Sequence, residues 1–370
     1  MPAGRRTSGA GRRLGGMVSG FALLAAALLV AAAVVAVIRG SDTSDEVDVR
    51  AEASARASEE RGRPPAAPSA PPTVGADALV DVAVATLWAE PAVTRPVDGG
   101  SLTNPVHVEQ WLSAMTTDDR LWLVDRTVTQ ALYGDRVRVL ETRGDWARVV
   151  VVGQPSSLHP DGYPGWLPAV QLSRPASADT GRSAVVTTPT AELRDPAEPT
   201  IAVMELSYAT ALPVTGVDDR GVTVARPDGR PGLLSPADVE VAGSAPGRPL
   251  GADLVDSARR FSGLPYLWAG TSALGFDCSG FTWGVYRAHG IVIPRDARDQ
   301  AAAGWPVEPS QLEPGDLLFY GASRDTIHHV AMYVGDGRMI QSPATGRTVE
   351  TVSVAGSPLA REFWGARRYV

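Results

Sequence analysis

The most regular pattern of apolar positions lies in the C-terminal third of the chain. After Cys278, Phe281 and Val285 are one helical turn apart within an apolar run that ends at Gly290. This spacing predicts a helix that starts at Asp277 or Cys278. The chain's single cysteine would then stand at the N-terminal end of that helix.

Two continuous apolar runs farther along the chain predict strands. Residues 317–320 follow a Glu-Pro-Gly-Asp turn, and residues 328–334 end at Gly-Asp-Gly. Successive side chains of a strand point to opposite faces, so His328 and His329 must face different sides of the predicted sheet. Only one of these two histidines can therefore face the predicted cysteine helix.

Short apolar runs separated by turn residues fill the middle of the chain and occur there twice. The first copy comprises residues 136–140, 144–150 and 165–168, and the second comprises residues 211–214, 221–224 and 232–235. This repetition predicts two small β-barrels, at residues 79–175 and 180–243. A helical insertion around residues 108–123 in the first barrel is expected from the family resemblance described below. Trp146 and Trp166 are expected to be core residues of the first barrel.

The N-terminal segment differs in composition from the rest of the chain. Arginines within residues 1–16 precede an apolar run at residues 17–38, which reaches the roughly 20 residues that a transmembrane helix needs and favours a cytoplasmic N-terminus. Residues 39–78 are rich in Ala, Pro, Ser, Glu and Arg, which predicts a disordered linker. We expect a single-pass membrane protein whose chain after residue 38 lies outside the cytoplasm, and secretion after cleavage of a signal peptide is the alternative.

Length and charge narrow the class of protein further. A chain of 370 residues is long enough for two or three domains with real cores. Its net charge of −7 argues against a nucleic-acid partner. No metal ion or cofactor is expected.

The position of Cys278 suggests a reactive thiol. A lone cysteine cannot form an internal disulfide, and the backbone N–H groups at a helix start lower the thiol pKa below its free value of about 8.5 and can hold an oxyanion. An inert, buried cysteine is the common alternative. A histidine on a neighbouring strand would complete the pair that a thiol peptidase needs, because imidazole takes the thiol proton and later passes it to the leaving amine.

Four segments of this region resemble the successive motifs of the NlpC-type cell-wall cysteine peptidases. They are YLWAG at residues 266–270, FDCSG at 276–280, LEPGDL at 312–317 and HVAMY at 329–333. The resemblance covers about residues 248–370. It implies an α+β fold in which a papain-like peptidase domain follows the two barrels along the chain.

The same resemblance assigns the catalytic residues. It implies that Cys278 is the nucleophile and that His329, rather than His328, is the base. The family's third catalytic residue falls twelve positions after the base, at Gln341, whose amide oxygen can orient the imidazole. Where the family usually has W-G-G, this chain has an alanine, Ala269, in the middle position.

The two repeats resemble bacterial SH3-like domains. The first resembles in particular the first barrel of γ-D-glutamyl-L-diamino-acid endopeptidases, whose wall recognises the free N-terminal L-Ala of a murein peptide. Tyr163, Asp277 and Ser279 match positions that bind this amine in the family. Val128 stands where the family has an acid, which implies a weaker requirement for the free amine.

These resemblances imply hydrolysis of the bond between γ-D-Glu and the diamino acid of peptidoglycan stem peptides or murein fragments. Cys278 would attack the γ-carbonyl, and His329 would protonate the leaving amine. The hydroxyl of Tyr266, which matches the family tyrosine near the thiol, and the Cys278 N–H would hold the oxyanion. The alternatives are a wall-binding scaffold without turnover and an amidase or acyltransferase on the same thiol fold.

The hairpin after His329 decides whether Gln341 can reach the base. A two-residue turn at residues 336–337 would place the two side chains on opposite faces of the sheet. A three-residue loop at residues 335–337, or an equivalent bulge, would pair Ala331 with Gln341 and bring both side chains to one face. We predict the second arrangement, with the Gln341 amide oxygen near one imidazole nitrogen.

Overall fold

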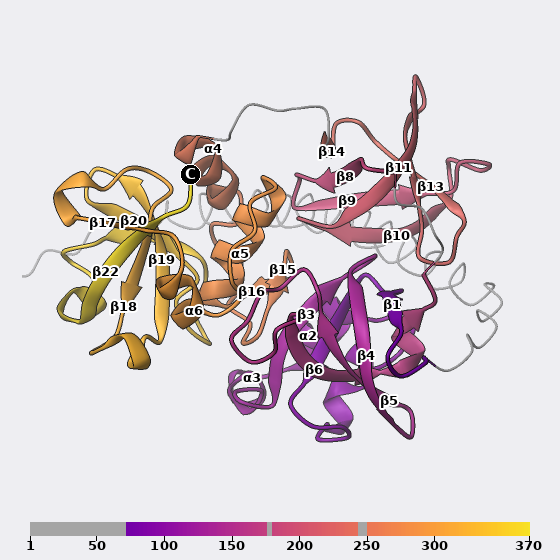
Figure 1. Ribbon diagram of the computed structural model, residues 1–370, viewed down its shortest axis with the longest axis horizontal. Helices are drawn as coiled ribbons and strands as arrows, with labels where there is room; N and C mark the ends of the chain where they lie inside the picture. The colour runs from indigo at the N-terminus through magenta and orange to yellow at the C-terminus, as the bar shows by residue number, and fades with distance from the viewer. Residues whose placement is uncertain (1–71, 176–179, 243–249) are drawn as a thin grey trace, which may run out of the picture. The chain divides into compact units, whose positions relative to one another are not determined.

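The computed structural model describes residues 72–175, 180–242 and 250–370 (Figure 1). The predicted cytoplasmic segment, the predicted transmembrane helix at residues 17–38 and nearly all of the predicted linker lie outside these ranges. Within them, no helix is long and apolar enough to cross a membrane.

The first repeat is a seven-stranded antiparallel sheet. Its strands are β1 (Asp77–Val80), β2 (Val84–Trp88), β3 (Thr127–Leu132), β4 (Arg136–Arg143), β5 (Trp146–Val151), β6 (Tyr163–Pro168) and β7 (Leu172–Ser173), in the order β3-β2-β6-β5-β4-β1-β7. Trp166 is buried as expected, whereas Trp146 is half-buried. The first strand begins two residues before the predicted boundary at residue 79, because Asp77 already pairs with Arg138 of β4.

The predicted helical insertion lies between β2 and β3. It contains η1 (Pro96–Ser101), α2 (Val108–Ala114) and α3 (Thr117–Trp122), and a further single turn, η2 (Ala169–Gln171), precedes β7. Helix α3 starts where the Thr116 side chain accepts a hydrogen bond from the Asp119 N–H. Helix α2 buries Trp111, whose indole N–H donates to the buried carboxylate of Asp98 at 3.0 Å.

The second repeat has the same topology as the first. Its strands are β8 (Ser183–Val186), β9 (Thr190–Arg194), β10 (Ala202–Ser207), β11 (Ala211–Asp218), β12 (Gly221–Ala225), β13 (Pro231–Leu234) and β14 (Val239–Ala242). Their order, β10-β9-β13-β12-β11-β8-β14, is that of the first repeat with each strand replaced by its counterpart. The predicted internal repeat is therefore confirmed strand by strand.

The C-terminal domain combines three helices with a six-stranded antiparallel sheet. The helices are α4 (Gly251–Arg259), α5 (Cys278–Ala288) and α6 (Ala297–Ala302), and the sheet contains β17 (Trp305–Val307), β18 (Leu317–Tyr320), β19 (His329–Gly335), β20 (Arg338–Gln341), β21 (Glu350–Ser353) and β22 (Phe363–Arg368). The strand order is β17-β22-β18-β19-β20-β21. Single turns η3 (Pro309–Gln311), η4 (Arg324–Thr326) and η5 (Pro358–Glu362) lie in the connections.

Helix α5 packs against β19 in the middle of this domain (Figure 1). The predicted cysteine helix and both predicted strands are therefore confirmed. A small hairpin of β15 (Thr271–Ser272) and β16 (Gly275–Phe276) precedes the helix. A Cβ atom on Gly280 would lie 2.0 Å from the Gly270 carbonyl oxygen, so only glycine lets the start of this hairpin approach the first turn of α5.

Candidate active site

Cys278 is the first residue of α5, and the residue before it closes the helix end. The Asp277 side chain accepts a hydrogen bond from the Gly280 N–H at 2.6 Å, as an N-cap does. This capping fixes the first turn and holds the thiol beside β19, where the backbone N–H groups of Val330 and Ser279 favour its thiolate.

The thiol is nevertheless less acidic than its place at a helix start predicts. Burial of the thiol raises the pKa of Cys278 to about 12, and the carboxylate of Asp277 acts in the same direction. The expectation of a lowered pKa is thus wrong for the free enzyme, because loss of hydration outweighs the helix N–H groups. The thiol is protonated at neutral pH and needs a base.

His329 provides an imidazole in the matching protonation state. The residue is 4 % exposed, and burial lowers its pKa to about 4, against the opposing effect of its hydrogen bond to Gln341. It is therefore neutral at pH 7 and can accept a proton. His328 points to the other face of the sheet, where it is exposed and contacts Glu362 at 2.7 Å.

The predicted contact between His329 and Gln341 is present. The Nε2 atom of the imidazole and the Oε1 atom of the amide are 2.7 Å apart, and Gln341 is buried. A bulge before Gly335 shifts the register of the hairpin by one residue, and continuing the pairing from Met332 and Ile340 places Ala331 opposite Gln341. The turn itself has two residues, so the bulge, and not a three-residue loop, brings both side chains to one face.

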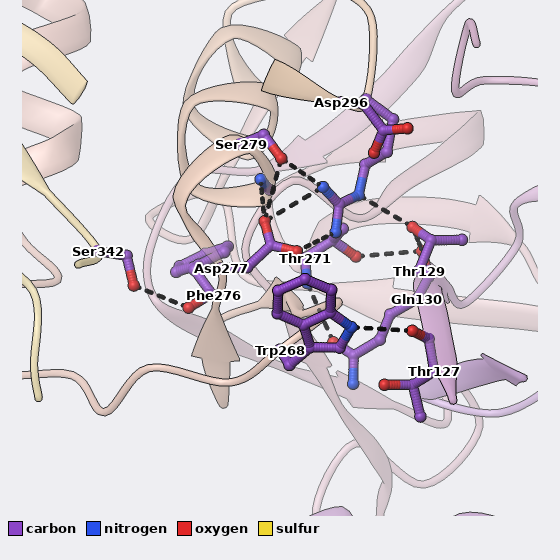
Figure 2. Close-up of polar contacts among 12 residues, drawn as sticks. Thr127, Thr129, Gln130, Trp268, Thr271, Phe276, Asp277, Ser279, Asp296 and Ser342 are labelled. Atoms are coloured by element: carbon purple, nitrogen blue, oxygen red, sulfur yellow. Dashed lines mark hydrogen bonds and ion pairs between the residues drawn. The ribbon is translucent and has the colours of Figure 1, made fainter. Parts of the chain in front are cut away.

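The start of α5 is also tied to the end of β20. Ser342, next to Gln341, donates from its hydroxyl to the Phe276 carbonyl oxygen at 2.7 Å (Figure 2). Both residues are buried. This bond holds the segment that leads into Cys278 against the end of the strand that bears Gln341.

Tyr266 lies close to the nucleophile. Its side chain is buried, and burial together with the nearby Cys278 raises the pKa of its hydroxyl, so the hydroxyl keeps its proton. A parallel bridge to Phe276 aligns this segment with the residues that lead into α5. The position suits a hydrogen-bond donor to an oxyanion.

Asp277 and Ser279 both bind Arg295, a residue that the motifs did not predict to be part of the site. Arg295 is 1 % exposed and contacts Asp277 through two bonds of 2.6 and 3.1 Å, and its Nη1 atom donates to the Ser279 hydroxyl at 2.9 Å. Figure 2 shows the Asp277 and Ser279 side chains turned toward each other. The charge of Asp277 is thus matched inside the protein by Arg295, and its contact with a substrate amine stays a prediction.

A second missed residue, Asp296, follows Arg295 and faces the first barrel. The Tyr163 hydroxyl, from β6, is 3.2 Å from both carboxylate oxygens of Asp296. Burial raises the pKa of this carboxyl, and no cation among the described residues forms an ion pair with it. Neither Arg295 nor Asp296 belongs to a periodic pattern of apolar residues. The sequence shows only that they lie in the loop between two helices, which does not by itself indicate a functional role.

Strand β3 of the first barrel contacts the peptidase domain through buried polar groups. The Thr129 hydroxyl accepts from Arg295 Nε at 3.0 Å, and the Gln130 side-chain oxygen accepts from the Thr271 N–H at 3.1 Å. Trp268 donates from its indole to the Thr127 carbonyl oxygen at 3.0 Å (Figure 2). Val128 lies between these contacts on β3 and offers no polar group.

Family models match the chain in three places. The NlpC/P60 family model matches residues 263–368. The model described as the bacterial dipeptidyl-peptidase Sh3 domain matches residues 125–172, and the one described as the YKFC SH3b2 domain matches residues 186–241. The predicted two SH3-like domains and NlpC-type peptidase domain are thus confirmed.

Relatives match over most of the chain. A γ-D-glutamyl-L-lysine dipeptidyl-peptidase from Bacillus cereus is 42% identical over 302 residues, which cover 79% of this chain and 91% of the relative. One from Bacillus subtilis is 38% identical over 291 residues, with 77% of this chain and 96% of the relative covered. The crystal structure of an NlpC/P60 family protein from Bacillus cereus matches with a TM-score of 0.76 at 42% identity, and the match covers 80% of this chain and 99% of that one. The chain is therefore a member of the NlpC/P60 family of cysteine peptidases.

Proposed function

We propose that this protein cleaves the bond between γ-D-Glu and the diamino acid of peptidoglycan stem peptides that have a free N-terminal L-Ala. The observation that carries the proposal is the contact between Tyr163 and Asp296. It supports the proposal because it holds a buried carboxylate directly after Arg295, and Arg295 pairs with Asp277, the residue before Cys278. The names of the two Bacillus relatives support the same bond.

The reaction begins from two neutral groups. Because Nε2 of His329 is bonded to Gln341, Nδ1 is the nitrogen left to take the proton from Cys278 as the sulfur attacks the γ-carbonyl carbon. The resulting oxyanion accepts hydrogen bonds from the Tyr266 hydroxyl and the Cys278 N–H. The imidazolium then gives its proton to the nitrogen of the departing diamino acid.

Water completes the cycle. His329 takes a proton from a water molecule, which attacks the thioester carbon and releases L-Ala-γ-D-Glu. The thiolate regains the proton as it leaves. The raised pKa of Cys278 slows this last step, because a less acidic thiol is a poorer leaving group.

The amine pocket has one acid in a place that the motifs did not predict. Burial disfavours the charged form of Asp296, so a substrate ammonium that restores an ion pair there gains more than it would in water. The Tyr163 hydroxyl keeps its proton, because burial raises its pKa, and it orients the carboxylate. With Val128 in place of an acid, Asp296 alone supplies the charge.

The protein is further proposed to act on the cell wall from the membrane. The apolar run at residues 17–38, preceded by arginines, supports a membrane anchor with the catalytic part outside the cytoplasm. The two SH3-like domains suit contact with peptidoglycan. A scaffold without turnover fits the structure less well, because a scaffold has no need for Cys278 and His329 to be held by capping and hydrogen bonds.

Mass spectrometry of products from L-Ala-γ-D-Glu-diaminopimelate, with a free or an acetylated N-terminus, tests the proposal. The free peptide should give L-Ala-γ-D-Glu, and acetylation should lower kcat/KM by roughly tenfold or more, because a hydrogen-bonded charge is lost. Cys278→Ala should abolish turnover and His328→Ala should keep it. Cleavage by Cys278→Ala would remove the peptidase assignment, and equal rates on both peptides would remove the amine pocket.

A further inference from the structure

Glu350 lies directly behind Gln341. The two residues are opposite each other in the β20–β21 ladder, and Gln341 Nε2 donates a hydrogen bond to Glu350 Oε1 at 3.0 Å. The other end of the same amide faces the base, with 2.7 Å between Gln341 Oε1 and His329 Nε2. A continuous chain of hydrogen bonds thus runs from the imidazole to a carboxylate whose side chain is 26 % exposed.

The carboxylate fixes which way the Gln341 amide points. An amide can present either its oxygen or its NH₂ group to a histidine nitrogen, whereas an ionised carboxylate only accepts hydrogen bonds. Glu350 therefore holds the NH₂ group on its own side and leaves the oxygen for His329. Turning the amide over would set its oxygen against the carboxylate, with one hydrogen bond lost and two acceptors facing each other.

The direction of the amide determines the tautomer of the base. The Gln341 oxygen can accept only from an N–H group, so neutral His329 carries its proton on Nε2. Its Nδ1 atom then has a free lone pair, which is what a base needs to take a proton from Cys278. With the amide reversed, the proton would sit on Nδ1 and this nitrogen could accept nothing.

We propose that Glu350 is a positioning residue that sets the tautomer of His329 through Gln341. The effect on catalysis rests on the function proposed above. The tautomer itself does not, because the hydrogen bonds that set it are present without substrate.

Arg347 holds the carboxylate in place. Its Nη2 atom lies 2.6 and 2.7 Å from the two oxygens of Glu350. The guanidinium offsets most of the negative charge, so Glu350 contributes mainly orientation and only a weak field at His329. The Arg347 carbonyl oxygen also accepts from the Tyr266 N–H at 2.9 Å, which joins this chain to the segment that bears the oxyanion tyrosine.

Glu350→Lys should reverse the Gln341 amide. An ammonium group only donates hydrogen bonds, so the Gln341 NH₂ group has no acceptor at this position and the Gln341 oxygen turns toward the lysine. Gln341 then presents its NH₂ group to His329, which moves the imidazole proton to Nδ1. We expect kcat to fall on the order of a hundredfold or more, as for a base in the wrong tautomer, and KM to change less than about twofold.

Two further variants separate orientation from loss of packing. Glu350→Ala leaves room for a water molecule that can accept from Gln341, so it should lower kcat only about tenfold, less than Glu350→Lys. Adding Gln341→Glu to Glu350→Lys restores an acceptor that faces His329 and should return kcat to within about tenfold of the wild type. If Glu350 only stabilised the fold, the two single variants would lower kcat by similar factors and Gln341→Glu would give no rescue.

Glu362→Lys is the matched control. Glu362 contacts His328, the exposed residue directly before β19, at the same 2.7 Å. This variant should keep the kcat of the wild type. A loss equal to that of Glu350→Lys would overturn the proposal.

Nitrogen-15 NMR of the full chain, labelled at its five histidines, reads the tautomer directly. At pH 7, well above the pKa of about 4 that burial gives His329, the wild type should carry the proton on Nε2 and Glu350→Lys should carry it on Nδ1. A proton on Nδ1 in the wild type, or on Nε2 in Glu350→Lys, would overturn the proposal. An NMR result as expected, in a chain that cleaves no stem peptide, would count against the proposed function alone.

Discussion

The two SH3-like domains share one strand order but contribute differently to the active site. In the first, Thr129 and Tyr163 contact Arg295 and Asp296, and Arg295 pairs with Asp277, the residue before Cys278. The second contacts the peptidase domain through other groups, such as the Ser207 hydroxyl, which accepts from the Ala273 N–H at 2.9 Å. Topology therefore does not decide which repeat serves catalysis.

The difference lies in the side chains that each repeat presents on equivalent strands. Strand β3 offers Thr129 and Gln130 to the peptidase domain, and its counterpart β10 is followed by Tyr208, which packs edge-to-face on Phe261 with ring centroids 4.9 Å apart. Thr129 and Gln130 bind a charged side chain and the backbone before α5, whereas β10 and Tyr208 add one hydroxyl contact and aromatic packing. Two copies of one fold thus contact the peptidase domain through different side chains.

Arg295→Ala should lower stability and activity more than any other substitution that distinguishes the two barrels. It leaves Asp277 buried without its partner, which costs on the order of 3–5 kcal/mol of unfolding free energy. It also removes the hydrogen bond that Arg295 donates to Thr129. Denaturant unfolding and kcat/KM should both fall. The matched variant is Arg226→Ala in the second barrel, where a buried arginine pairs with Asp228 at 2.8 Å.

Arg226→Ala should lower stability and leave kcat/KM unchanged in the fraction that remains folded. Equal losses of kcat/KM in the two variants would mean that both barrels support the active site through stability alone. The difference between the barrels would then be one of contact and not of function.

Tyr163→Phe should give the next largest effect. Loss of the hydroxyl that orients Asp296 should lower kcat/KM for the free-amine peptide by about tenfold, since a hydrogen bond to a charged group is lost, and leave the acetylated peptide nearly unaffected. Tyr208→Phe in the second barrel is the control and should change neither rate. A similar loss on both peptides would show that Tyr163 supports packing and not the amine.

Asp81→Asn probes a carboxyl of the first barrel that faces charges of the second. Burial and the nearby Asp228 raise the pKa of Asp81 to about 6, against the opposing effects of Arg226 and Arg230. Because the folded state then holds a proton more tightly than the unfolded state, Asp81 lowers stability as pH rises from about 4 to 6. The variant should be more stable by about 1 kcal/mol at pH 7, after allowance for partial solvent exposure, and unchanged below pH 4.

Thermal unfolding at several pH values measures this effect. The prediction that Asp81 lowers stability with rising pH would be wrong if the stability of the wild type rose more steeply between pH 5 and 7 than that of Asp81→Asn. Tyr133, whose buried hydroxyl faces the same carboxyl, stays protonated throughout this range because burial raises its pKa.

The smallest effect concerns a turn that both barrels share. Two residues after β3 and two residues after β10, the backbone is left-handed, with φ of 81° at Gly134 and 64° at Ala209. Ala209→Gly should stabilise by roughly 0.5–1 kcal/mol, because the strain of a left-handed alanine exceeds the added entropy of an unfolded glycine. Gly134→Ala should destabilise, since its Cβ would lie 2.6 Å from Leu212 Cδ2. Midpoints of denaturant unfolding that move in the same direction for both would contradict this account.

The local elements of the catalytic domain were predictable from the sequence. Apolar spacing located helix α5 and strands β18 and β19, and strand alternation separated His328 from His329. The repeat of short strands likewise predicted both barrels, and the family resemblance predicted the insertion in the first. These features follow from side-chain periods of 3.6 and 2 residues, which neighbouring residues set by themselves.

The protonation states and partners of the site were decided only by the tertiary structure. Asp277 meets Arg295, which is 18 residues away, and Tyr163 meets Asp296, which is 133 residues away. Burial in the assembled domain raises the pKa of Cys278, although its place at a helix start predicted the opposite. Hydrogen bonds and hydration depend on which distant groups come within about 3 Å of each other, and no local period records that.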